Sequence, residues 1–77
     1  MKYSQEHLAE LNLLLQFDIS SSATGIKVHQ DASEDVQSAV SRLYEKGLCT
    51  QPDGGYLTDE GIETAEKVDK VIRVLNA

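Results

Sequence analysis

The side chains best suited to metal binding are two histidines and one cysteine, and they are widely spaced along the chain. His7 and His29 are 22 residues apart, and Cys49 follows 20 residues later. Zinc ligands usually come in close pairs such as C-x-x-C or H-x-x-x-H, because one turn or hairpin presents two of them to the same ion. The sequence contains no such pair. We therefore predict no metal site.

The residues that could support nucleophilic catalysis do not form a complete set. Cys49 and His29 would be a conceivable nucleophile and base, but nothing identifies an orienting acid or an oxyanion hole. The serine run 20–22 lacks a surrounding G-x-S-x-G, and Gly54-Gly55 is not followed by the Gly-Lys-Ser/Thr of a phosphate-binding loop. We predict that the protein has no catalytic residue and no cofactor, and is not an enzyme. Cys49 is expected to be a small core residue.

Four acidic residues gather near the start of the last predicted helix, where they could suggest a cation site. They wind around the helix instead of converging, and the spaced D-x-D-x-D-G pattern of a calcium loop is absent. We expect them to complement the helix dipole and to aid solubility. These residues are Asp59, Glu60, Glu63 and Glu66.

Length, charge and cysteine content exclude several classes of protein. The 77 residues carry 7 basic and 13 acidic side chains, a net charge of −6, which disfavours polyanionic partners such as nucleic acids and anionic membranes. A single cysteine excludes an internal disulfide framework and suits a reducing compartment. The sequence shows no signal-peptide pattern, and no stretch approaches the roughly 20 apolar residues of a membrane span. We expect one domain over residues 1–77, located in the cytoplasm without membrane contact.

Apolar periodicity and capping residues predict three helices. They run over residues 5–16, 34–46 and 59–75. Each follows a residue suited to N-capping, namely Ser4, Asp31 or Ser33, and Thr58. In the first helix the leucines at 8, 11, 14 and 15 are expected to share one face, with Leu13 off that stripe. In the last helix, acid-first i, i+4 spacing predicts the ion pairs Glu63–Lys67, Glu66–Lys70 and Asp69–Arg73.

Between the helices the sequence predicts short strands and tight turns. Alternation over 26–28 indicates a short strand within an otherwise loop-like segment, 18–30. Residues 48–50 and 56–57 are predicted to pair as a hairpin around the segment 51–55. This prediction rests on turn residues. Gly47 is expected to end the second helix in a left-handed conformation, and Asp53, Gly54 and Gly55 are expected to form the tight turn.

The segment from Asp31 to Lys67 resembles part of winged-helix proteins. Leu43-Tyr44-Glu45-Lys46-Gly47-Leu48 matches the "L-x-x-K/R-G-L" that ends their recognition helix, and the stretch from Asp53 to Gly61 is similar to the wing and "LT-x-x-G" helix start of MarR-like and PadR-like regulators. The whole chain also looks like a family of very short bacterial proteins of unassigned function that share the "TQPDGGYLT" hairpin. The resemblance implies an α+β fold, a trimmed winged helix with three helices and a short hairpin.

A DNA-binding role is the alternative that the resemblance implies, with Arg42 and Lys46 touching phosphates. The expected outward face of the helix 34–46 carries three acids and two bases, and the wing tip has no cation. A DNA reader needs cations to neutralise phosphates as well as base contacts. We therefore expect no nucleic-acid binding. The outward residues are Glu34, Asp35, Gln37, Ser38, Ser41, Arg42, Glu45 and Lys46.

The last helix is apolar over a wider arc than one core-facing stripe requires. Gly61, Ala65, Val68, Ile72 and Leu75 follow the 4-3-4-3 spacing of a coiled-coil seam, and two further valines broaden it. Either the first helix, with its extra Leu13, covers the surplus within one chain, or two copies pair. We favour a homodimer that acts as a small non-enzymatic module binding an unknown protein. The candidate interface is Val68, Val71, Ile72, Val74 and Leu75.

Overall fold

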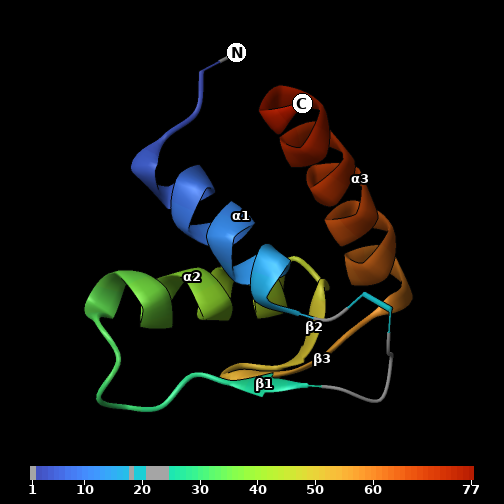
Figure 1. Ribbon diagram of the computed structural model, residues 1–77. Helices are drawn as coiled ribbons and strands as arrows, with labels where there is room; N and C mark the ends of the chain where they lie inside the picture. Colours follow the sequence, from blue (N-terminus) through green and yellow to red (C-terminus); the bar gives the residue numbers. More distant parts are fainter. Residues whose placement is uncertain (1, 18, 21–24) are drawn as a thin grey trace.

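The computed structural model describes residues 2–17, 19–20 and 25–77, and within these it contains three helices and a small antiparallel sheet (Figure 1). This confirms the predicted α+β class. Ser21 and Ser22 of the serine run, and part of the predicted loop 18–30, lie outside the described residues. The elements in chain order are α1 (Gln5–Gln16), β1 (Ile26–Lys27), α2 (Glu34–Glu45), β2 (Cys49–Gln51), β3 (Gly54–Leu57) and α3 (Asp59–Asn76).

Side-chain caps fix where each helix begins. The Ser4 hydroxyl accepts from the His7 backbone N–H at 3.1 Å, and His7 Nδ1 accepts from the Ser4 N–H at 3.2 Å, which makes a reciprocal capping box. Ser33, not Asp31, caps α2 by accepting from the Val36 N–H. Caps of this kind satisfy N–H groups that have no partner inside the helix.

Thr58 links the start of α3 to the end of α2. Its Oγ1 accepts from the Gly61 N–H at 3.0 Å and donates to the Gly47 carbonyl oxygen at 2.6 Å. Gly47 lies just beyond α2 with φ +78°, a conformation that lets the chain reverse into the hairpin. One hydroxyl therefore couples two helices across the hairpin.

The sheet has the order β1-β3-β2, so the short strand β1 adds to the free edge of the hairpin. Ile26 pairs with Gly55, and the Val28 N–H donates to the Asp53 carbonyl oxygen at 2.7 Å. The predicted bounds of the hairpin strands need a correction, because β2 and β3 extend inward to Gln51 and Gly54 and leave Pro52-Asp53 as the connection. Pairing of Gly54 and Gly55 with β1 accounts for their place in a strand.

The core brings together one face of α1, one face of α2 and single residues of β2 and α3. Leu13 lies off the stripe of Leu8, Leu11 and Leu15, as predicted, but it is 2% exposed and belongs to the core, whereas Leu8 is half exposed. The prediction that Leu14 shares a face with Leu8 and Leu15 is wrong, because Leu14 is buried beside Leu13 and the C-cap residue Phe17. The buried apolar residues are Leu13, Leu14, Phe17, Ala39, Val40, Leu43, Cys49 and Ala65.

Helices α1 and α3 run in opposite directions beside one another, so that the N-terminal segment and the end of α3 lie at the same end of the molecule (Figure 1). The helix α2 lies below α1, next to the sheet (Figure 1). None of the helices in the described part of the chain is both long and apolar enough to cross a membrane.

Candidate functional site

The C-terminal half of α3 leaves its apolar side chains uncovered. Val71, Val74 and Leu75 are 52%, 59% and 73% exposed, and Ile72 is 39% exposed. Val68, the first residue of the predicted interface, is half-buried and packs against the core. The surface formed by Val71, Ile72, Val74 and Leu75, hereafter the α3 tip, is therefore the part of the predicted interface that the monomer leaves free.

The N-terminal half of the predicted seam has a different role. Ala65 is 1% exposed, and Gly61 is also buried. A Cβ atom added at Gly61 would lie 1.9 Å from the Leu48 carbonyl oxygen, so the backbone of α3 approaches the chain before β2 closely at this point. The 4-3-4-3 pattern thus serves the protein's own core up to Val68 and becomes surface beyond it.

A mainly apolar groove of about 230 Å³ lies between α1 and α3. Leu8 and Leu15 on the α1 wall are 51% and 39% exposed. At about 100° per residue, Leu8, Leu11 and Leu15 fall on one side of α1, about 150° from the centre of its core face. The helix therefore has two apolar faces. The groove residues are Tyr3, Leu8, Leu11, Asn12, Leu15, Thr64, Lys67, Val68, Val71 and Ile72.

Tyr3, which precedes α1, also lines this groove and is not part of the predicted interface. Its side chain is 79% exposed, and its ring meets the His7 imidazole edge to face with centroids 6.4 Å apart. Tyrosine presents a large apolar body with a polar tip, which is favourable at contact surfaces. The spacing of Leu8, Leu11 and Leu15 predicted a shared face of α1 but not its place in a groove, and the sequence contains no signal for Tyr3.

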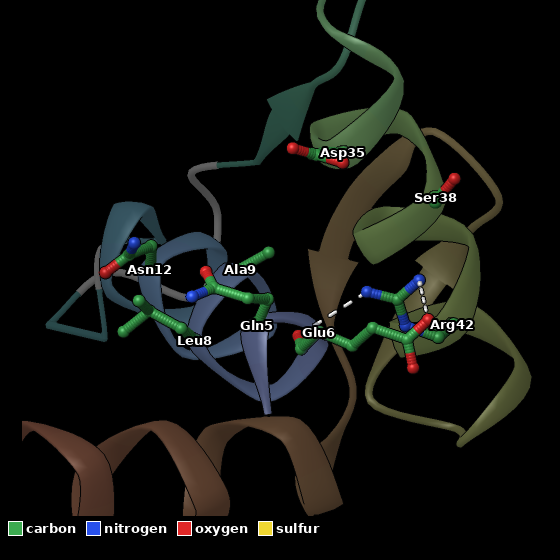
Figure 2. Close-up of a pocket in the computed structure, with 8 residues that line it drawn as sticks. All are labelled: Gln5, Glu6, Leu8, Ala9, Asn12, Asp35, Ser38 and Arg42. Atoms are coloured by element: carbon green, nitrogen blue, oxygen red, sulfur yellow. Dashed lines mark hydrogen bonds and ion pairs between the residues drawn. The ribbon is translucent and has the colours of Figure 1, made fainter. Parts of the chain in front are cut away.

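A second, more polar hollow of about 290 Å³ lies between α1 and α2 (Figure 2). Leu8 lines both hollows, and in Figure 2 it points away from Arg42. Asp35 and Glu6 stand on its borders, and the Glu6 carboxylate lies 3.7 Å from Arg42 Nη1. The one cation among the described residues that line it, Arg42, is already paired with carboxylates, and the two acidic side chains disfavour phosphate or another anion.

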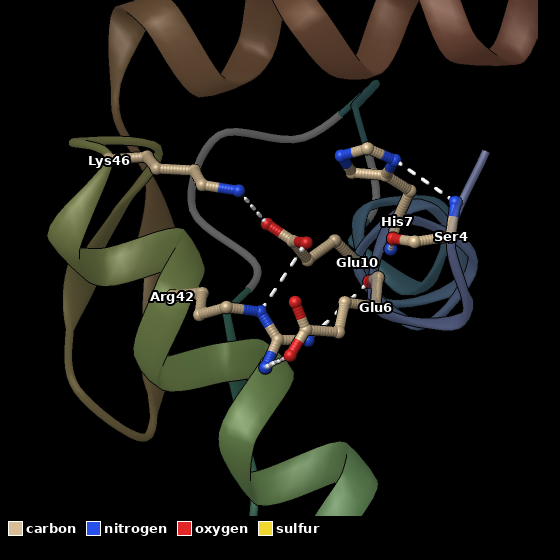
Figure 3. A network of polar contacts seen from close by, with 6 residues as sticks. All are labelled: Ser4, Glu6, His7, Glu10, Arg42 and Lys46. Carbon is tan, nitrogen blue, oxygen red and sulfur yellow. Dashed lines mark hydrogen bonds and ion pairs between the residues drawn. The ribbon is translucent and has the colours of Figure 1, made fainter. Parts of the chain in front are cut away.

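Arg42 and Lys46 are both engaged by α1 carboxylates (Figure 3). Glu10 is 6% exposed; its Oε2 lies 3.4 Å from Arg42 Nε and its Oε1 pairs with Lys46 Nζ. Arg42 Nη2 also donates to the Glu6 carbonyl oxygen at 3.4 Å. This network could not be predicted from the sequence, because residues 6 and 10 meet residues 42 and 46 only through tertiary packing. These ion pairs hold α1 against α2.

On α3 two of the three predicted i, i+4 ion pairs are present. Glu63 and Lys67 pair at 3.0 Å, and Asp69 and Arg73 pair at 2.9 Å. Glu66 and Lys70 form no ion pair within the part of the chain that the structure describes, so that prediction is wrong. Favourable spacing allows such a pair but gains little at an exposed site.

Cys49 is buried, and its thiol donates to the Gln51 carbonyl oxygen at 3.4 Å. Burial raises the pKa of the thiol above its ordinary value, which disfavours the reactive thiolate. His29 is exposed on the loop before α2, whereas His7 belongs to the α1 cap. Among the described residues, no group of three His, Cys, Asp or Glu side chains could hold a metal ion.

These observations define a small α+β protein with three helices, a three-stranded antiparallel sheet and an apolar surface on α1 and α3. The chain belongs to DUF5669, a family of unknown function, which it matches over residues 1–76. Neither a curated protein nor a solved structure shows significant similarity to it.

Proposed function

We propose that the protein is a small non-enzymatic interaction module of the cytoplasm that works as a homodimer and binds a further protein. The observation that carries this proposal is the uncovered α3 tip, where four neighbouring aliphatic residues are 39–73% exposed. The largest contiguous apolar patch on the surface of a small protein is often a contact site. A second copy offers the same patch, and two-fold pairing uses it twice.

A homodimer also supplies stability that a chain of this length lacks. Domains of about 60–80 residues bury a modest fraction of their surface, and their cores contribute only a few kcal/mol of net stability. Here eight apolar residues make up the buried core of the described chain. Covering the α3 tip would add apolar burial at about 25 cal/mol per Å².

A DNA-binding regulator remains the second candidate, because the order helix, strand, helix, hairpin, helix resembles that of a winged helix that lacks one helix. In such a protein α2 would face the DNA. Its two expected phosphate-binding residues, Arg42 and Lys46, are instead held by Glu6 and Glu10 of α1. DNA contact would have to break these pairs, which favours the interaction module.

Substitutions on the α3 tip test the homodimer. Val71→Glu with Val74→Glu places carboxylates on residues that are 52% and 59% exposed, so the monomer fold should persist while pairing fails. We expect sedimentation velocity to show a dimer for the unmodified chain and a monomer for the variant, with unchanged far-UV circular dichroism. Gln30→Glu, on the exposed loop before α2, is the control and should remain dimeric. A dimeric double variant would refute the proposed surface.

A further inference from the structure

Each molecule carries both the apolar groove between α1 and α3 and an exposed apolar end of α3 that does not fill this groove. Val71 and Ile72 line the groove between α1 and α3, whereas Val74 and Leu75 are not among its lining residues. These last two are 59% and 73% exposed, so Leu75 is the most exposed aliphatic side chain of the helix. Val74 and Leu75 therefore do not cover the groove of their own molecule, and both the groove and these two side chains stay exposed in the monomer.

The size and lining of the groove favour side chains over a small molecule as its occupant. Its volume is about 230 Å³, below the roughly 300–1,000 Å³ of typical small-molecule sites. Such sites also place a small number of unpaired polar groups so that they orient the ligand. Here the polar members are Asn12, Thr64 and Lys67, and Lys67 is already paired with Glu63. Leucine and isoleucine walls accept aliphatic side chains.

The buried area favours one of two ways of pairing. Contact through the α3 tip alone would cover four side chains that are 39–73% exposed, roughly 300 Å² of apolar surface per molecule. Two copies would then bury about 600 Å² of apolar surface, and since interfaces are little more than half apolar, the total would only reach the lower limit of roughly 1,000 Å² for a specific interface. Adding Tyr3, Leu8 and Leu15 of the groove brings the apolar area to roughly 600 Å² per molecule, or about 1,200 Å² in total.

We propose that the groove between α1 and α3 receives the end of α3 from a second copy, with Leu75 of one molecule seated beside Leu8 of the other. Two-fold symmetry fills both grooves at once and leaves no free copy of either surface. The inference rests on the proposed homodimer. It goes further by making α1 half of the interface and by giving Tyr3, Leu8 and Leu15 a role in recognition.

Engineered disulfides test this seating directly. Leu8→Cys and Leu75→Cys are placed in separate chains, mixed in equal amounts and oxidised mildly, and peptide mass spectrometry identifies the linked residues. Both positions are at least half exposed, so the fold should tolerate the changes. The unmodified chain reports the background of Cys49, a buried thiol with a raised pKa. A mixture of Gln30→Cys with Leu75→Cys reports random collision.

We expect the 8–75 linkage to exceed the 30–75 linkage by about tenfold or more, because thiols held together in a complex have a higher effective concentration than colliding chains. A dimer in sedimentation that yields mainly 75–75 linkage, with 8–75 at the collision level, would overturn this inference and leave the homodimer intact. Monomeric chains with no linkage above collision would overturn both proposals.

Discussion

Among the five glycines, Gly61 is the one at which an added methyl group would make the closest contact. Alanine inside a helix normally stabilises it relative to glycine by about 0.5–1 kcal/mol. At Gly61 the new Cβ would meet the Leu48 carbonyl oxygen at 1.9 Å, which forces α3 away from the hairpin. We expect Gly61→Ala to lower the free energy of unfolding by about 1–3 kcal/mol, measured by urea denaturation. Glu60→Ala, on the exposed neighbouring position, should change it by less than about 0.5 kcal/mol.

Substitution of a hairpin glycine is also expected to destabilise the protein. Gly54 and Gly55 have φ of +128° and +71°, and a Cβ at Gly55 would lie 2.5 Å from Thr50 Oγ1. Gly54→Val or Gly55→Val should each lower the free energy of unfolding by about 1 kcal/mol or more, which thermal melts monitored by circular dichroism would detect. Unchanged melting for both variants would contradict this account of the hairpin.

At the scale of the element, the Glu10 network holds α1 on α2. Removing the Glu10 carboxylate leaves the partly buried Arg42 without its closest ion pair. We expect Glu10→Gln to lower the free energy of unfolding by about 1–2 kcal/mol. Glu6→Gln, whose carboxylate is 71% exposed and 3.7 Å from Arg42, should lower it by less than about 0.5 kcal/mol. Additive losses in Glu10→Gln with Arg42→Gln would show that the two side chains do not interact.

The bounds of the helices could be predicted from the sequence, whereas the pairing of the strand β1 could not. The caps at Ser4, Ser33 and Thr58 are local, and for this reason the helices were predictable to within one or two residues. The place of β1 depended on pairing with β3, a contact between residues 27 or more positions apart. Local periodicity carries no information about such pairing.

The candidate surface was predictable in part for the same reason. Val71, Val74 and Leu75 stand out as surplus apolar residues on α3, and they are exposed. On α1 the leucines divide between two faces, so one predicted stripe put Leu14 on the wrong face and did not reveal the groove. Glu10 is an ordinary charged residue in the sequence, and only contact with α2 explains its burial. Partner helices decide which of two apolar faces becomes core.

At the scale of the whole molecule, charge predicts the response to DNA. The chain carries a net charge of −6, and Arg42 of α2 and Lys46, the residue that follows this helix, are both paired with Glu10 of α1. We expect no binding to random duplex DNA at about 150 mM salt, measured by fluorescence anisotropy, because the protein repels a polyanion before contact. Sub-micromolar binding that weakens steeply with salt would instead support a DNA-binding regulator.

The central claim is that the apolar surface of α1 and α3 pairs two copies of the chain. Multi-angle light scattering of the unmodified protein at about 100 μM tests it, since an interface of this modest area is expected to bind in the micromolar range. The chain mass is 8.5 kDa, so the account predicts about twice that value, decreasing on dilution. A mass of 8.5 kDa at that concentration would contradict the homodimer and leave the α3 tip without its proposed partner.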